Sequence, residues 1–134
     1  MTDRFSSWRR WTDRKDLPRL DLPGVYVLAH RHTDTGFAVI LTTWVVYIGE
    51  TCARSLGKRL DEFARSARTG RRGHSGGRAY HERFGAPQPE LHVKVLAVTI
   101  ADPVLRSVWI RYRERQLIWE HFLECKEFPV CNLK

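Results

Sequence analysis

The sequence lacks an apolar run long enough to cross a membrane and has too few cysteines for a disulfide framework. Its longest apolar stretch, residues 37–48, is interrupted by two threonines and falls short of the ~18 residues that a membrane span requires. The N-terminal residues hold no apolar core that a secretory signal could use, so we expect a cytoplasmic protein. Three cysteines cannot all pair and none forms a C-x2-C motif, so we expect reduced thiols.

Acidic residues are scarce relative to basic ones. The 15 Asp and Glu residues are outnumbered by 23 Lys and Arg residues, which gives a formal net charge of +8. Residues 54–83 carry nine basic and three acidic side chains, so this segment alone contributes +6. Such a concentration suits a polyanion, most simply a nucleic acid, either DNA or RNA. Composition alone leaves a solvated helix face as the other interpretation.

The length of 134 residues fits one domain, because domains usually hold about 100–200 residues. A hydrophobic content of 43% and a charged content of 28% are typical of a folded soluble protein. We assign residues 1–20, which are basic and aromatic, to a short helical N-terminal arm. Residues 21–134 are then the single domain.

Hydrophobic periodicity predicts the element order β-β-α-α-β-α. Strands are expected at 24–29, 37–48 and 91–100, with the first two forming an antiparallel hairpin around turn residues at 30–36. An amphipathic helix is expected from Leu56 to just before Gly70, a short one around 78–84, and a long one from Asp102-Pro103 to about 124. Residues 71–77 contain so much glycine that a loop is expected there.

Several short motifs become informative through their order. They are Gly24-Val25-Tyr26, Tyr47-Ile48-Gly49, Arg59 in Lys58-Arg59-Leu60, His74 in Gly73-His74-Ser75, Glu114 in Glu-x-x-Leu-Ile, and Asn132 in Pro-x-x-Asn. Each alone is typical of an ordinary core or surface residue. Together, over about residues 23–132, they resemble the GIY-YIG nuclease superfamily. The gap between the two tyrosines is longer than in its compact members, and residues 30–36 can hold the extra length.

The resemblance implies a small α/β domain of the α+β type, with a three-stranded antiparallel sheet flanked by helices. It also implies hydrolysis of phosphodiester bonds with one divalent metal ion, Mg²⁺ or Mn²⁺. In that scheme Tyr47 orients or deprotonates the attacking water and Tyr26 lines the same pocket. Arg59 contacts the scissile phosphate, Glu114 is the sole protein ligand of the metal, and Asn132 holds the far edge of the site.

The chemistry of these residue types agrees with such roles. One carboxylate plus waters and phosphate oxygens suits a hard cation, and an arginine fork matches the oxygens of a phosphate. A phenol with a pKa of ~10 is a poor base until a nearby cation, here Arg59 or Lys58, lowers that pKa. The basic side chains expected to contact the substrate backbone, without reading its sequence, are Lys58, Arg65, Arg68, Arg71, Arg72 and Arg78.

Two assignments stay open. Glu120 lies twelve residues before Asn132, as the metal ligand does in the excision-repair members of the family. We favour Glu114, because it shares its helix face with apolar residues, and a carboxylate in such a setting needs a partner such as a metal ion. His74 acts either as a proton acceptor, as a loop histidine does in some members, or only as a ligand of phosphate or solvent.

The sequence therefore predicts a metal-dependent DNA endonuclease, a monomer or a homodimer with no membrane contact. A catalytically inactive nucleic-acid-binding module on the same fold is the alternative. A partner-binding domain with a basic face is a third hypothesis, and it predicts no salt-dependent affinity for nucleic acid.

Overall fold

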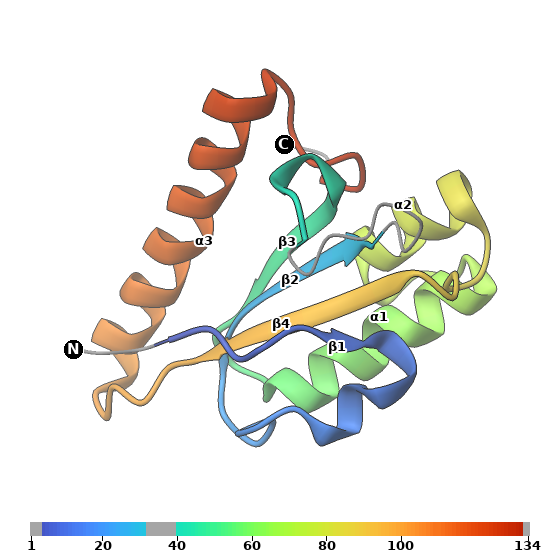
Figure 1. Ribbon diagram of the computed structural model, residues 1–134. Helices are drawn as coiled ribbons and strands as arrows, with labels where there is room; N and C mark the ends of the chain where they lie inside the picture. Colours follow the sequence, from blue (N-terminus) through green and yellow to red (C-terminus); the bar gives the residue numbers. More distant parts are fainter. Residues whose placement is uncertain (1–3, 32–39, 133–134) are drawn as a thin grey trace.

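The computed structural model describes residues 4–31 and 40–132. The strands along the chain are β1 (Arg9–Arg10), β2 (Gly24–His30), β3 (Val45–Thr51) and β4 (Leu91–Ala97). The helices are α1 (Leu56–Thr69), α2 (Ser75–Phe84) and α3 (Pro103–Cys125), with 3₁₀ helices at Trp11–Asp16 and Thr42–Trp44. In Figure 1, α3 lies on one side of the sheet, and α1 and α2 lie on the other. The mixed α/β class predicted from the sequence is confirmed.

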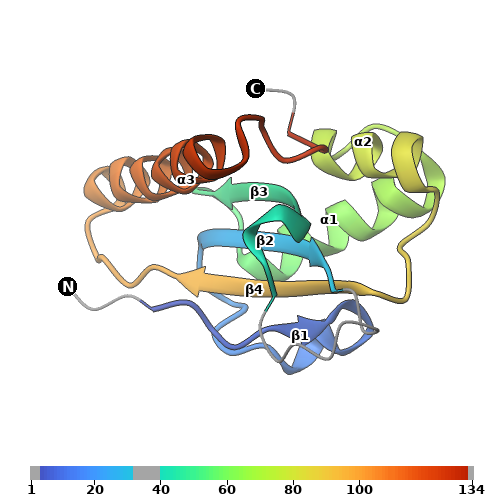
Figure 2. The ribbon, with the colours of Figure 1, turned by 45° about the horizontal axis from the view of Figure 1, so that its top comes forward.

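The sheet has four antiparallel strands among the described residues, in the order β1-β4-β2-β3, so the predicted three-stranded sheet is wrong by one strand (Figure 2). The additional strand is β1, in which Arg9 pairs with Val93 and Arg10 with His92 of β4. A strand of two residues is too short to show alternation in the sequence, and only its pairing with a distant strand defines it. It comes from the segment predicted to be a helical arm.

Residues of that N-terminal segment pack against the core of the domain. Trp11 is buried and stands edge-on to Phe63 of α1, with ring centroids 5.3 Å apart. Leu17 is buried in the same cluster. Only the short 3₁₀ helix at Trp11–Asp16 matches the predicted helical character.

The central strand β2 is buried along its whole length because both faces of the sheet are covered. On one face, Tyr26 and Leu28 pack with residues of α1 and α2. On the other face, Val25 and Val27 pack with residues of α3. The alternation of side chains along β2 thus divides the core into two clusters, one on each side of the sheet.

Side chains cap the starts of two helices, and one of the two caps, Asp102, was predicted from the sequence. Ser55 accepts a hydrogen bond from the Lys58 backbone N–H at the start of α1, and Gly70 ends this helix with a positive φ. Asp102 accepts hydrogen bonds from two backbone N–H groups in the first turn of α3. These side chains satisfy N–H groups that a helix leaves without an internal partner.

Helix α2 begins at Ser75, so the predicted loop over residues 71–77 is wrong for its last three residues. A Cβ atom on Gly76 would lie 2.4 Å from the Tyr47 ring, and one on Gly77 would lie 2.7 Å from the Phe63 backbone oxygen. These glycines allow close packing of α2, whereas the sequence predicted an irregular loop there. His74 caps the helix by accepting the Gly77 N–H.

The remaining element boundaries differ only in part. Strand β4 ends at Ala97, before the predicted residue 100. The turn predicted at 30–36, and the first part of the strand predicted at 37–48, lie mostly outside the described residues. The described part of that strand begins with the 3₁₀ helix and becomes β3 only at Val45. No helix within residues 4–31 and 40–132 is long and apolar enough to cross a membrane.

Candidate active site

Tyr26 of β2 and Tyr47 of β3 meet on the face of the sheet that α1 and α2 cover. Their ring centroids are 6.0 Å apart, and both side chains are buried. Gly49 pairs with Tyr26 across the two strands, and a Cβ atom there would lie 2.5 Å from both rings. The glycine at the end of the Tyr-Ile-Gly motif therefore provides the space in which the two tyrosines contact each other.

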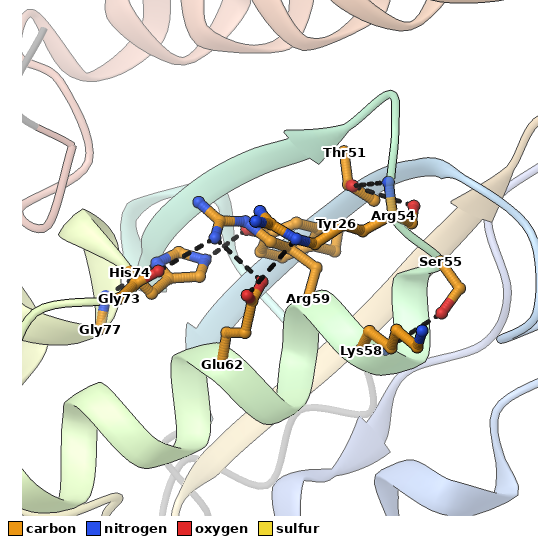
Figure 3. Close-up of polar contacts among 10 residues, drawn as sticks. All are labelled: Tyr26, Thr51, Arg54, Ser55, Lys58, Arg59, Glu62, Gly73, His74 and Gly77. Carbon is orange, nitrogen blue, oxygen red and sulfur yellow. Dashed lines mark hydrogen bonds and ion pairs between the residues drawn. The ribbon is translucent and has the colours of Figure 1, made fainter.

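His74 holds Tyr26 from the start of α2 (Figure 3). The His74 Nε2 atom lies 2.5 Å from the Tyr26 hydroxyl, and His74 Nδ1 accepts the Gly77 backbone N–H at 3.1 Å. Burial, reinforced by the Arg59 charge, lowers the pKa of His74 to about 3, so its ring is neutral near pH 7. Because Nδ1 is an acceptor, the single ring proton lies on Nε2, which donates to the Tyr26 oxygen. This arrangement leaves His74 no free acceptor atom.

Arg59 projects from α1 toward the two phenols. Its NH1 atom donates to Glu62 Oε1 at 3.1 Å and to the Gly73 backbone oxygen at 3.2 Å (Figure 3). Burial raises the pKa values of Tyr26 and Tyr47, and the Arg59 charge acts in the opposite direction on both. Both phenols are therefore protonated in the resting protein, with a fixed cation beside them.

Glu114 of α3 borders a hollow of about 180 Å³ that Tyr47 also lines. The hollow is also lined by Ser75 and Asn132, and the Glu114 side chain is 17% exposed. Burial raises the pKa of Glu114 to about 6, and nearby Glu50 adds to the increase, while Arg115 opposes it. The carboxylate is therefore partly desolvated and beside a second acidic group.

Glu120, the rival carboxylate, lies elsewhere. Its side chain is exposed on α3 and borders a separate hollow that Trp8 and Lys94 also line. That hollow contains neither candidate tyrosine. Of the two carboxylates, Glu114 is the one beside Tyr47.

Asn132 binds the backbone of β3 with both ends of its amide. Its Nδ2 donates to the Ile48 oxygen and its Oδ1 accepts the Ile48 N–H, each at 2.9 Å. The neighbouring Cys131 N–H donates to the Val46 oxygen at 2.8 Å. These bonds hold the strand on either side of Tyr47, so Asn132 positions the site through the backbone.

The predicted substrate-contacting residues separate into two groups. Arg72 and Arg78 border a hollow of about 510 Å³ next to His74, and Arg78 pairs with Glu82 at 3.8 Å. The other four are exposed on α1 or just after it and do not border this hollow; they are Lys58, Arg65, Arg68 and Arg71.

Some residues of the site were missed in the sequence. Gly76 leaves room for the Tyr47 ring, Glu62 binds Arg59, and Glu50 lies close enough to Glu114 to affect its pKa. Gly49 was named in the Tyr-Ile-Gly motif but was given no role there. The i, i+3 spacing of Arg59 and Glu62 was a usable signal, because residues at that spacing are neighbours on a helix. The other contacts join separate elements, and no local spacing indicates them.

We found no match to this chain among protein-family models, curated proteins or solved structures. Within the part of the chain that the structure describes, no three His, Cys, Asp or Glu side chains form a metal-binding group. The geometry around Tyr47 is therefore the main guide to function.

Proposed function

We propose that the chain is a metal-dependent endonuclease of the GIY-YIG type that hydrolyses phosphodiester bonds in DNA. One observation carries the proposal: the Arg59 cation and the partly desolvated Glu114 carboxylate both act on the Tyr47 phenol, and Glu114 borders the same hollow as Tyr47. Tyr26, His74 and the strand held by Asn132 complete the surroundings. A cation and a carboxylate that both act on one phenol are groups that phosphodiester hydrolysis can use.

The residues around Glu114 suit a divalent cation. The carboxylate is partly buried beside Glu50, and its contact with Arg115 is long, at 3.7 Å. A bound cation would relieve the cost of ionising it. One carboxylate, with water and substrate oxygens as the other ligands, is a donor set that Mg²⁺ or Mn²⁺ accepts. When bound there, the ion would polarise a phosphate oxygen.

Side chains of the protein have the other roles in the reaction. Arg59 presents its guanidinium to the phosphate and stabilises negative charge as it develops there. Tyr47 borders the hollow and orients the attacking water. Tyr26 packs beside Tyr47 and is itself held by His74. Tyr26 and His74 therefore act by positioning Tyr47. Arg72 and Arg78 contact the DNA backbone beside this centre.

Two further features support a nucleic-acid substrate and a cytoplasmic location. Residues 54–83, which carry +6 of the net charge of +8, include Arg59 and the segment around His74. All three cysteines are unpaired, which supports a cytoplasmic location, where thiols stay reduced.

Cleavage of single-stranded, nicked, branched and duplex DNA in Mg²⁺ or Mn²⁺ tests the proposal. We expect cleavage by the unaltered protein, and a loss of about 100-fold or more in Glu114→Ala and Tyr47→Phe while DNA binding survives. Glu120→Ala is the matched control, because it removes an exposed carboxylate of the same helix and should cut normally.

Two results would contradict the proposal. Binding of all these substrates without cleavage in either metal would favour the inactive nucleic-acid-binding module. Loss of cleavage in Glu120→Ala with full cleavage in Glu114→Ala would show that Glu114 is the wrong ligand.

A further inference from the structure

Glu62 binds the Arg59 guanidinium from one turn further along α1. The Glu62 Oε1 atom accepts from Arg59 NH1 at 3.1 Å, and the two side chains are 25% and 20% exposed (Figure 3). A pair this sheltered is screened less by solvent than a surface pair. The reaction outlined above does not use Glu62.

The same Arg59 nitrogen also donates to the Gly73 backbone oxygen at 3.2 Å. Gly73 directly precedes His74, which holds Tyr26. The contacts from Glu62 through Arg59 to Gly73 therefore connect α1 to the segment that fixes the tyrosine. Both bonds use NH1, so one end of the guanidinium is anchored toward the protein.

The second oxygen of Glu62 faces another arginine. Arg54 Nε lies 3.5 Å from Glu62 Oε2, and its side chain is 58% exposed. One carboxylate thus balances two guanidinium groups that would otherwise repel each other. An arginine side chain loses rotamer freedom when it is fixed, and Glu62 fixes Arg59 before any substrate arrives.

We propose that Glu62 is a positioning residue for the cleavage reaction, which holds Arg59 in the orientation that meets the scissile phosphate. The inference rests on the proposed nuclease function. Glu62 is negative and lies close to the expected position of the scissile phosphate, so it should affect DNA binding and DNA cleavage in opposite directions. Its charge weakens DNA binding, while its hydrogen bond to Arg59 speeds cleavage.

Measuring DNA affinity and the single-turnover cleavage rate separately in Glu62→Gln tests this role. Affinity is measured in a Glu114→Ala background, where DNA stays intact. We expect cleavage to slow by about 10- to 100-fold, because small displacements of a catalytic group have effects of that size. We expect DNA affinity to increase about threefold, because a nearby negative charge is gone.

Two further variants separate orientation from charge. Asp61→Asn removes the same charge from the adjacent position of α1, where the carboxylate pairs with Lys15 and not with Arg59. It should tighten DNA binding and leave the cleavage rate unchanged. Glu62→Asp keeps the charge but shortens the side chain, so it should slow cleavage without tightening binding. Thermal unfolding verifies that each variant is folded.

The outcomes distinguish the two proposals. If the unaltered protein cleaves DNA and Glu62→Gln behaves like Asp61→Asn, the positioning role is wrong and the nuclease function stands. If the unaltered protein never cleaves DNA, the nuclease function and the role of Glu62 are both wrong.

Discussion

At the scale of single residues, the surroundings of four ionisable groups in the candidate site favour their neutral forms. Burial raises the pKa values of Tyr26, Tyr47 and Glu114 and lowers that of His74, and each shift favours the neutral form. Arg59 is the fixed charge among them. Perturbed pKa values gathered among neighbouring side chains are typical of functional sites.

The raised pKa of Glu114 gives a testable stability change. Its carboxyl is protonated in both the folded and the unfolded state below the ordinary pKa of 4.5, so it favours neither. As the pH rises through about 6, the folded state has to ionise a group that the unfolded state ionises more readily, and stability is lost. Glu114→Gln should therefore raise the free energy of unfolding at pH 8 by about 1–2 kcal/mol.

Denaturant titrations at pH 4 and pH 8, with and without Mg²⁺, check this expectation. The gain in Glu114→Gln should disappear at pH 4, where the native carboxyl is neutral. Mg²⁺ should stabilise the unaltered protein at pH 8 and have no effect on the variant, because a ligand stabilises the state that binds it. An equal gain at both pH values would contradict the assigned pKa shift.

At the scale of elements, the start of α2 depends on glycines that allow close packing. Gly77→Ala would normally stabilise a helix, since alanine is favoured over glycine by about 1 kcal/mol. Here the added Cβ atom would lie 2.7 Å from the Phe63 backbone oxygen, which cannot move without displacing α1. We expect a destabilisation of about 1–3 kcal/mol, as in other overpacked cores.

Chemical denaturation of Gly77→Ala and of Ser75→Ala measures this effect. Ser75 lies in the same first turn but is exposed, so its substitution should change stability by less than about 0.5 kcal/mol. A stabilised Gly77→Ala would show that α1 and α2 pack less closely than described.

Local signals in the sequence predicted the elements that such signals control. The apolar spacing from Leu56 and the caps at Asp102 and Gly70 placed α1 and α3 within a few residues. Strand β1 could not be found this way, because only its pairing with β4 makes it a strand. The start of α2 was missed because the sequence does not show what surrounds a glycine.

The candidate site was predicted to a similar extent. The motif order singled out six residues. In the structure, four of them lie around the other two, Tyr26 and Tyr47. The contacts among these residues could not be predicted from the sequence. Whether His74 donates or accepts depends on the Gly77 N–H, and the position of Asn132 depends on a strand far away in the chain.

At the scale of the whole molecule, Asn132 joins distant parts of the chain at one edge of the sheet. Asn132→Ala would remove both partners of Ile48, an N–H and a C=O that border the site. Leaving such groups without partners costs about 1–3 kcal/mol. We expect this loss of stability together with slower DNA cleavage.

Hydrogen exchange of the Ile48 amide checks that expectation directly. The Ile48 N–H should exchange faster in the variant, while the amides of β2, which pairs with strands on both sides, serve as the internal control. Unchanged protection of Ile48 would contradict the positioning role of Asn132.

The bond between Asn132 and Ile48 also bears on when the site can form. It joins residues 84 positions apart, and contacts of that separation close late because ordering the intervening chain costs entropy. During synthesis, β2, β3 and α1 leave the ribosome long before residue 132 does. Tyr47 therefore gains its final support only after α3 has been made, so the candidate site is completed late in a newly made molecule.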